Sequence, residues 1–216
     1  MSRSDAEILW EVACGLARTA AEVSGAAGPA GALPPLLLFT DPARTPRPWE
    51  VAARLPAGAA VVFRHFGSPD ARTAARRLRD ATKAEGVHLL IGLDADLAAE
   101  VGADGVHLPE RALDRAEDLR GGRPDWLITG AVHGTDSIAR AAHVHAMVLS
   151  PVFPAGGPSA SRPALGAARF SELASAASRP VYALGGITAA NAPSLLGSGA
   201  CGLAGVDALQ TAFGCA

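Results

Sequence analysis

Short apolar runs alternate with helical patterns along most of the chain, and this alternation constrains the fold more than any other feature. The strand-like runs are residues 36–40, 60–65, 88–93, 105–108, 127–132, 146–150, 181–184 and 202–206. The helical patterns between them are residues 49–55, 69–85, 95–101, 111–119, 135–142, 167–177 and 189–196. The strands are apolar on both faces, as in a parallel sheet that helices cover. We therefore predict an α/β fold, a closed (β/α)₈ TIM barrel, with an open doubly wound sheet as the alternative.

An additional helix is expected before the first strand. Ser4 and Glu7 have the spacing of a capping box, which predicts a helix that runs to about Ser24. Its apolar face should pack against the barrel, and a role in forming a homo-oligomer is the alternative. The residues of that face are Ile8, Val12, Leu16 and Ala20. We divide the chain into residues 1–33, an N-terminal helix with a glycine-rich linker, and residues 34–216, one barrel domain with a truncated last helix.

Composition limits the class of partner. The 216 residues are 49% hydrophobic with a net charge of −2, which indicates a compact soluble protein without a basic surface for nucleic acid or membranes. No apolar run is long enough to span a membrane, and the N-terminus does not resemble a signal peptide. Cys14, Cys201 and Cys215 have neither metal-ligand nor disulfide spacing, so we expect a cytoplasmic protein with reduced thiols.

One lysine, Lys83, is present among the 19 basic residues. Barrel aldolases that form a Schiff base need a desolvated lysine at the end of a strand. Lys83 instead falls on the polar face of a predicted helix, so this class of enzyme is excluded.

The chemistry of such a barrel lies where its strands end and the following loops begin. Gly185 and Gly186 follow the seventh strand of the pattern, where backbone N–H groups can approach an anion such as phosphate closely. A tight strand-to-helix turn is the alternative interpretation of this pair. The long loop at residues 150–162 is rich in Gly, Ser and Pro and is expected to form a lid.

Six segments together resemble the thiamine phosphate synthase/TenI family over residues 36–209. They are L-L-L-F-T-D, V-V-F-R-H-F, G-A-D-G-V-H-L, S-P-V-F-P, Y-A-L-G-G-I and G-L-A-G-V-D-A-L. The resemblance implies a (β/α)₈ barrel that acts in thiamine biosynthesis on a phosphorylated small molecule. One branch of the family joins hydroxymethylpyrimidine diphosphate to a thiazole phosphate with Mg²⁺. The other branch, TenI, aromatises a thiazole phosphate carboxylate by moving a proton without a metal.

Several positions depart from the synthase pattern: Val62, Phe66, Gly92, Leu93, Ala112, Pro158 and Asp207. Leu93 and Ala112 stand where the synthase has carboxylates for Mg²⁺, which prefers oxygen ligands. Asp94 and Glu110 are neighbouring carboxylates that could substitute, although a helix N-cap and a surface acid are the simpler interpretations. We expect no cofactor, with Mg²⁺ required only if synthase activity is retained. Asp207 opposes phosphate binding unless it is paired or points away.

His133 stands at the place of the proton-transfer histidine of TenI, and a histidine suits that role because it titrates near neutral pH. A hydrogen-bonded structural histidine is the alternative. The expected substrate and phosphate site consists of Arg64, Gly185, Gly186, Gly205, Val206, Ser159 and Arg162. His107 is expected in the core, His65 has no assigned role, and three further histidines are expected at helix ends or on the surface: His88, His143 and His145.

The residues therefore favour TenI-like, metal-independent tautomerase chemistry on a thiazole phosphate. Thiamine phosphate synthase activity is one alternative. A second alternative is a non-catalytic protein that binds a phosphorylated ligand or has a regulatory role.

Overall fold

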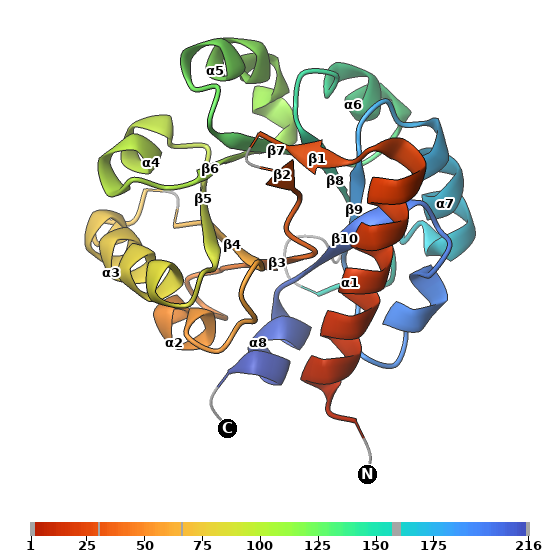
Figure 1. Ribbon diagram of the computed structural model, residues 1–216, viewed down its shortest axis with the longest axis horizontal. Coiled ribbons are helices and arrows are strands. Elements are labelled where there is room, and N and C mark those ends of the chain that lie inside the picture. The colour runs from red at the N-terminus through yellow and green to blue at the C-terminus, as the bar shows by residue number, and fades with distance from the viewer. Residues whose placement is uncertain (1–2, 30, 66, 157–160, 215–216) are drawn as a thin grey trace.

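Eight parallel strands form a closed barrel in the computed structural model, which describes residues 3–29, 31–65, 67–156 and 161–214 (Figure 1). The strands are β3 (Leu36–Phe39), β4 (Ala60–Phe63), β5 (His88–Gly92), β6 (Gly105–Leu108), β7 (Leu127–Val132), β8 (Ala146–Leu149), β9 (Val181–Leu184) and β10 (Ala200–Gly205). Each pairs in parallel with its neighbours, and β10 closes the ring onto β3. The predicted (β/α)₈ barrel is confirmed, and the open-sheet alternative is wrong.

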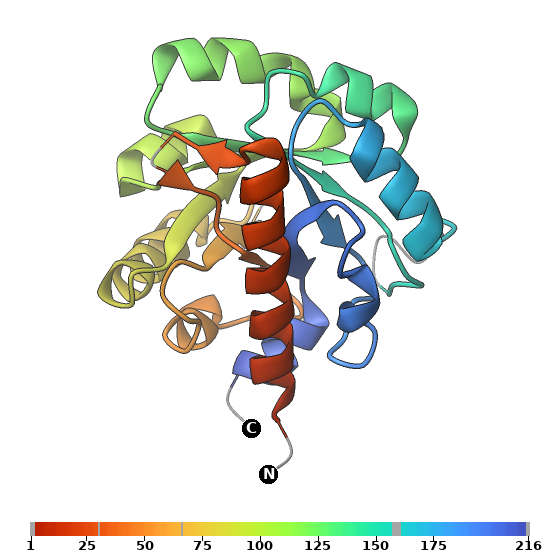
Figure 2. The ribbon, with the colours of Figure 1, turned by 45° about the vertical axis from the view of Figure 1, so that its right-hand side comes forward.

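Helices surround the barrel (Figures 1 and 2). They are α2 (Pro48–Ala52), α3 (Ala71–Ala84), α4 (Ala95–Val101), the 3₁₀ helix η1 (Glu110–Arg115), α5 (Ala116–Gly122), α6 (Thr135–Arg140), α7 (Gly166–Ala176), the 3₁₀ helix η3 (Ala192–Leu195) and α8 (Asp207–Phe213). Two segments predicted as helices are partly or wholly 3₁₀ helices in the structure. Residues 111–119 divide into η1 and α5, with non-helical angles at Ala112. Residues 189–196 form only η3, because Pro193 cannot continue the hydrogen-bond ladder of a longer helix.

Alternation along each strand produces two apolar layers. Leu37, Phe39 and Val62 belong to the cluster inside the barrel, whereas Leu38 and Val61 belong to the cluster between the strands and the helices. All of these side chains are at most 1% exposed. Burying an aliphatic or aromatic side chain of this size stabilises a fold by about 1.5–3 kcal/mol, so both faces contribute strongly. Because both faces of each strand are buried, the strand sequences are continuous apolar runs.

The N-terminal helix α1 (Asp5–Ser24) lies beside β10, as both ribbon views show (Figures 1 and 2). The predicted capping box is present, since Ser4 Oγ accepts from the Glu7 N–H while the Glu7 carboxylate accepts from the Ser4 N–H. The buried face is rotated from the predicted one and contains Leu9, Val12, Ala13 and Leu16, while Ile8 and Ala20 are only partly buried. No helix in the described part of the chain has the length and apolarity needed to cross a membrane.

The glycine-rich linker contains a small hairpin that the sequence analysis did not predict. Its strands β1 (Ala27–Gly28) and β2 (Gly31–Ala32) pair antiparallel. A Cβ atom on Gly28 would lie 3.4 Å from Cδ1 of Leu127, the first residue of β7. The hairpin therefore packs closely over the N-terminal end of the barrel.

Candidate active site

The C-terminal ends of the strands carry two groups of polar residues at the mouth of the barrel. The arginine cluster consists of Asp41, Arg44, Arg64 and Asp207, and the histidine cluster consists of Glu110, His133, Ser137 and Ser150. The first surrounds the ends of β3, β4 and β10, and the second the ends of β6, β7 and β8. Chemistry in barrels of this kind takes place at this end.

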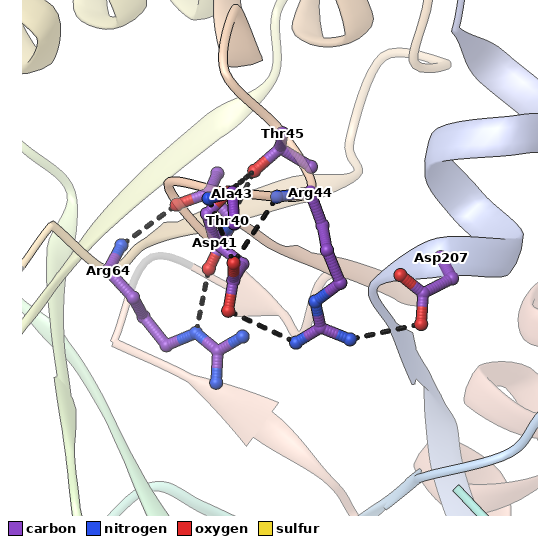
Figure 3. A network of polar contacts seen from close by, with 7 residues as sticks. All are labelled: Thr40, Asp41, Ala43, Arg44, Thr45, Arg64 and Asp207. Atoms are coloured by element: carbon purple, nitrogen blue, oxygen red, sulfur yellow. Dashed lines mark hydrogen bonds and ion pairs between the residues drawn. The ribbon is translucent and has the colours of Figure 1, made fainter. Parts of the chain in front are cut away.

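Arg64 is held rigidly at the end of β4. Its backbone N–H donates to Thr40 Oγ1 at 2.9 Å and its Nε–H donates to the Thr40 carbonyl at 2.9 Å. The guanidinium carbon lies 5.1 Å from the centre of the Phe39 ring. Figure 3 shows the two terminal nitrogens directed away from Thr40. Burial lowers the pKa of Arg64, but a guanidinium remains charged at any physiological pH, so its terminal N–H groups can bind an anion.

Arg44 links two carboxylates across the rim of the mouth (Figure 3). Its Nη1 lies 3.0 Å from Asp207 Oδ2, and its Nη2 lies 3.2 Å from Asp41 Oδ2. Burial acts to raise the pKa of Asp41, but hydrogen bonds from Arg44 and the Ala43 N–H lower it overall. Asp207 is therefore paired with Arg44. A paired carboxylate need not oppose the binding of a phosphate nearby. Arg44 was not among the residues predicted from the sequence, because its partner Asp207 is 163 positions away.

Gly185 and Gly186 have φ of 103° and 63°, which disfavour any residue with a side chain. A Cβ on Gly185 would lie 2.8 Å from Pro151 Cα, and one on Gly186 would lie 2.4 Å from the Pro154 carbonyl oxygen. Close approach of the segment after β8 thus requires both glycines. Within the described residues, neither N–H group donates to a backbone carbonyl. The pair therefore forms a tight turn, and its role as a phosphate cradle stays a prediction.

His133 at the end of β7 is oriented by the neighbouring strand. Its Nδ1 lies 2.8 Å from the Ser150 carbonyl oxygen, which can only accept, so Nδ1 carries the proton. Its Nε2 lies 3.6 Å from Glu110 Oε2. Its backbone N–H donates to Ser137 Oγ at 2.9 Å. In the neutral ring, Nε2 is therefore the nitrogen without a proton, and the Glu110 carboxylate is its neighbour.

The other histidines have structural surroundings. His107 is 5% exposed and hydrogen-bonds through Nδ1 to Thr129 Oγ1 at 3.0 Å, which confirms its predicted place in the core. Burial, with a smaller contribution from Arg64, lowers its pKa to about 3. His65 stacks on Phe63 with ring centres 4.3 Å apart. His88 and His145 are half-buried, so the expectation of surface or helix-end positions was wrong for them; His88 begins β5 and His145 directly precedes β8.

The positions where the synthase pattern has carboxylates for Mg²⁺ carry no carboxylate in this chain. Leu93, which has a left-handed φ of 64°, and Ala112 supply no side-chain oxygen. Asp94 caps α4, because its Oδ1 accepts from the Leu97 N–H at 2.9 Å, and Glu110 faces His133. Among the described residues, no group of three or more His, Cys, Asp or Glu side chains could hold a metal ion. Mg²⁺ coordination usually needs one or two carboxylates together with the phosphates of the substrate.

The long loop after β8 is anchored at both ends. Val152 and Phe153 donate their N–H groups to the carbonyls of Leu184 and Gly185, at 2.9 and 3.0 Å. Leu165 donates to the Pro151 carbonyl at 3.0 Å. Further along the loop, Arg162 is exposed. Three positions singled out in the sequence, Phe66, Pro158 and Ser159, lie outside the described residues, as does Cys215.

The remaining predicted site residues lie around the same mouth. Gly205 ends β10 and Val206 precedes α8, and both are partly buried. Arg64 is separated from the glycine pair by β3 and β10 in the barrel order. Lys83 is exposed in the last turn of α3, away from any strand end, as predicted.

Comparisons with known proteins agree with one another. The profile of the family described as thiamine monophosphate synthase matches residues 37–209. The thiamine-phosphate synthase of Methanoculleus marisnigri is 36% identical over 142 residues, which are 65% of this chain and 67% of that protein. The putative thiamine-phosphate synthase of Geobacter sulfurreducens is 36% identical over 140 residues, 62% of this chain and 64% of that protein. A thiamine phosphate pyrophosphorylase from Pyrococcus furiosus shares the fold, with a TM-score of 0.69 and 22% identity over 82% of this chain and 91% of that one.

Proposed function

Since the chain belongs to the thiamine monophosphate synthase family, we propose that it binds a thiazole phosphate at the C-terminal mouth of the barrel. We propose further that His133 moves a proton on this substrate without a metal ion. The reaction is a TenI-like tautomerisation, in which the same histidine removes a proton from one atom of the ring and returns it to another.

The orientation of His133 carries this proposal. The bond from Nδ1 to the Ser150 carbonyl fixes the tautomer, so Nε2 is the nitrogen that accepts the proton. The Glu110 carboxylate, 3.6 Å from Nε2, stabilises the positive charge that then forms. A general acid–base positioned in this way contributes about 10²–10⁴-fold to a reaction rate.

Arg64 and the backbone groups at Gly185, Gly186, Gly205 and Val206 are the proposed phosphate ligands. A guanidinium already fastened through Nε loses little further entropy when its terminal N–H groups bind an anion. The two glycines supply N–H groups without side chains in the way. Arg44 offsets the charge of Asp207 at the edge of this site.

Synthase activity is the second candidate, supported by the names of relatives that are 36% identical. That reaction needs Mg²⁺ and cations around a diphosphate leaving group. Leu93 and Ala112 remove the carboxylates that the synthase pattern provides, and Pro158 stands near the position of its loop lysine. This chain therefore lacks the residues for that chemistry at the expected positions.

Assaying both reactions on the same purified protein tests the proposal. We expect aromatisation of the thiazole phosphate carboxylate with or without EDTA, and no thiamine phosphate from the two synthase substrates with Mg²⁺. Formation of thiamine phosphate at a steady rate would overturn the assignment in favour of the synthase. Binding of a thiazole phosphate without turnover in either assay would instead identify a binding protein.

A further inference from the structure

A polar cavity of about 470 Å³ lies at the opposite end of the barrel from the proposed active site. Its lining includes residues 24–29, from the end of α1 through β1, together with Arg120, His145, Ser178 and Arg179. His145 directly precedes β8 and Arg179 lies just before β9, so the cavity is at the N-terminal ends of the strands. The hairpin β1–β2 lies over this end of the barrel (Figure 1).

Both arginines are fastened to backbone carbonyls. Arg179 Nε–H donates to the Ala142 carbonyl at 2.8 Å, and Arg120 Nη1–H donates to the His143 carbonyl at 3.3 Å. The other guanidinium nitrogens have no partner among the described residues. Each side chain is therefore positioned while most of its donors remain available.

Among the described residues, no carboxylate is paired with the positive charge in this cavity. None of the lining residues is a carboxylate. Neither Arg120 nor Arg179 forms an ion pair with a carboxylate anywhere in the described ranges. Two like charges around one half-buried space repel one another, and a bound anion relieves that repulsion.

His145 adds a neutral donor to the same wall. Its Nδ1 accepts from the Ile128 N–H at 3.0 Å, so the neutral ring carries its proton on Nε2. Burial, followed by the charges of Arg120 and Arg179, lowers the pKa of His145 to about 4. The ring is therefore uncharged at neutral pH and adds a donor without adding to the repulsion.

We propose that this cavity is a second anion site, which binds a phosphate group between Arg120 and Arg179. Two guanidinium groups balance the two negative charges of a phosphate dianion and offer it charge-assisted hydrogen bonds. The Ser178 hydroxyl and His145 Nε2–H are further donors on the cavity wall. The site does not depend on the proposed reaction, because none of its residues belongs to the catalytic mouth.

Calorimetric titration with inorganic phosphate, and separately with glycerol 3-phosphate, distinguishes free phosphate from a phosphate ester as the ligand. We expect binding of at least one of the two to be weakened 10-fold or more when Arg120→Gln and Arg179→Gln are combined. Arg169→Gln removes an exposed arginine paired with Glu172 and is the matched control, which should bind as the wild type does. Arg64→Gln disables the proposed site at the other end and should leave this binding event intact.

Binding that Arg64→Gln abolishes, or that the double variant leaves unchanged, would overturn the proposal. So would the absence of binding at 10 mM ligand.

A measurement on the wild-type protein keeps the test independent of how the variants fold. The NMR pH titration of the His145 ring, assigned with His145→Asn, should show its pKa rise from about 4 when phosphate is saturating. The rise is expected because a bound anion offsets the field of the two arginines. An unchanged titration curve with and without phosphate would contradict binding in this cavity.

Discussion

Arg44 at the C-terminal mouth and the two arginines at the N-terminal end of the barrel are used in opposite ways. At the C-terminal mouth, Arg44 lies between the carboxylates of Asp41 and Asp207 and is neutralised by them. At the N-terminal end, Arg120 and Arg179 are fastened to carbonyl oxygens, and neither pairs with a carboxylate in the part of the chain that the structure describes. An arginine between two carboxylates holds loops together, whereas one fastened to carbonyls keeps its charge for a ligand. The side chain is the same, and its neighbours decide which task it has.

The histidines at the two ends of the barrel differ in which ring nitrogen carries the proton. His133 donates from Nδ1 to the Ser150 carbonyl, which leaves Nε2 as a base beside Glu110. His145 accepts at Nδ1 from the Ile128 N–H, which leaves Nε2 as a donor beside two arginines. One backbone contact thus selects the tautomer and, through it, whether the outward nitrogen accepts or donates a proton.

The largest effect is expected from His133→Ala. Loss of the general acid–base should lower turnover in the tautomerase assay by about 10²–10⁴-fold while the fold is retained. The matched control is His143→Ala, which removes an exposed histidine and should leave turnover unchanged. Full turnover in His133→Ala would move the proton-transfer role elsewhere, with Glu110 and His65 the next residues to test.

Acid should destabilise the protein through the histidine buried beneath the mouth. His107 has a folded-state pKa of about 3, below an unfolded value near 6.5, so its contribution is complete above pH 6.5 and is lost as the pH falls toward 3. Between pH 7 and 4.5 this amounts to about 2–3 kcal/mol. Urea unfolding at the two pH values should show a loss of at least that size, reduced in His107→Asn. His145, whose pKa is lowered to about 4, contributes over the same pH range, so His145→Asn should also reduce the loss; an equal loss in wild type and His107→Asn would contradict this account.

Arg64→Gln should weaken substrate binding more than it slows the chemistry. A hydrogen bond to a charged group contributes about 1.5–3 kcal/mol, so KM should rise about 10- to 100-fold with a smaller change in kcat. Steady-state kinetics against Arg169→Gln as the control measures this. A fall in kcat with constant KM would place Arg64 in the proton transfer instead.

The smallest effect is expected from Asp207→Asn. Exposed ion pairs contribute about 0–1 kcal/mol, and the Asp207 side chain is 63% exposed. Removing its charge leaves Arg44 partly unpaired near the proposed phosphate ligands, so KM should fall by up to about 5-fold. A rise in KM would mean that pairing with Arg44 orders the site rather than opposing the phosphate.

Prediction from sequence succeeded where the signal was local. The capping box at Ser4 and Glu7, and the apolar runs of the eight strands, depend on residues close together in the chain. It failed where the determining partner is distant or the element is very short. The hairpin at residues 27–32 has strands of two residues, too few for a pattern to emerge.

The strand-end residues of the candidate site could be predicted from local sequence, whereas their distant partners could not. His133, Arg64 and the glycine pair could be selected from the sequence because each directly follows a strand, and parallel strands bring their C-terminal ends to one mouth. The partners of these residues could not be selected. Nothing near residue 44 indicates that its arginine binds Asp207, and nothing near residue 133 indicates that Ser150 fixes the tautomer.

The sequence alone therefore determined the barrel, its N-terminal helix and the strand ends that carry chemistry, because periodicity and turn residues act over a few positions. Tertiary structure alone decided charge and protonation. Whether Arg44 is neutralised, whether Arg120 and Arg179 are not, and which nitrogen of His133 or His145 holds the proton depend on contacts between segments far apart in the chain. Electrostatic interactions depend on distance in space and on burial, and the closing of the barrel sets both.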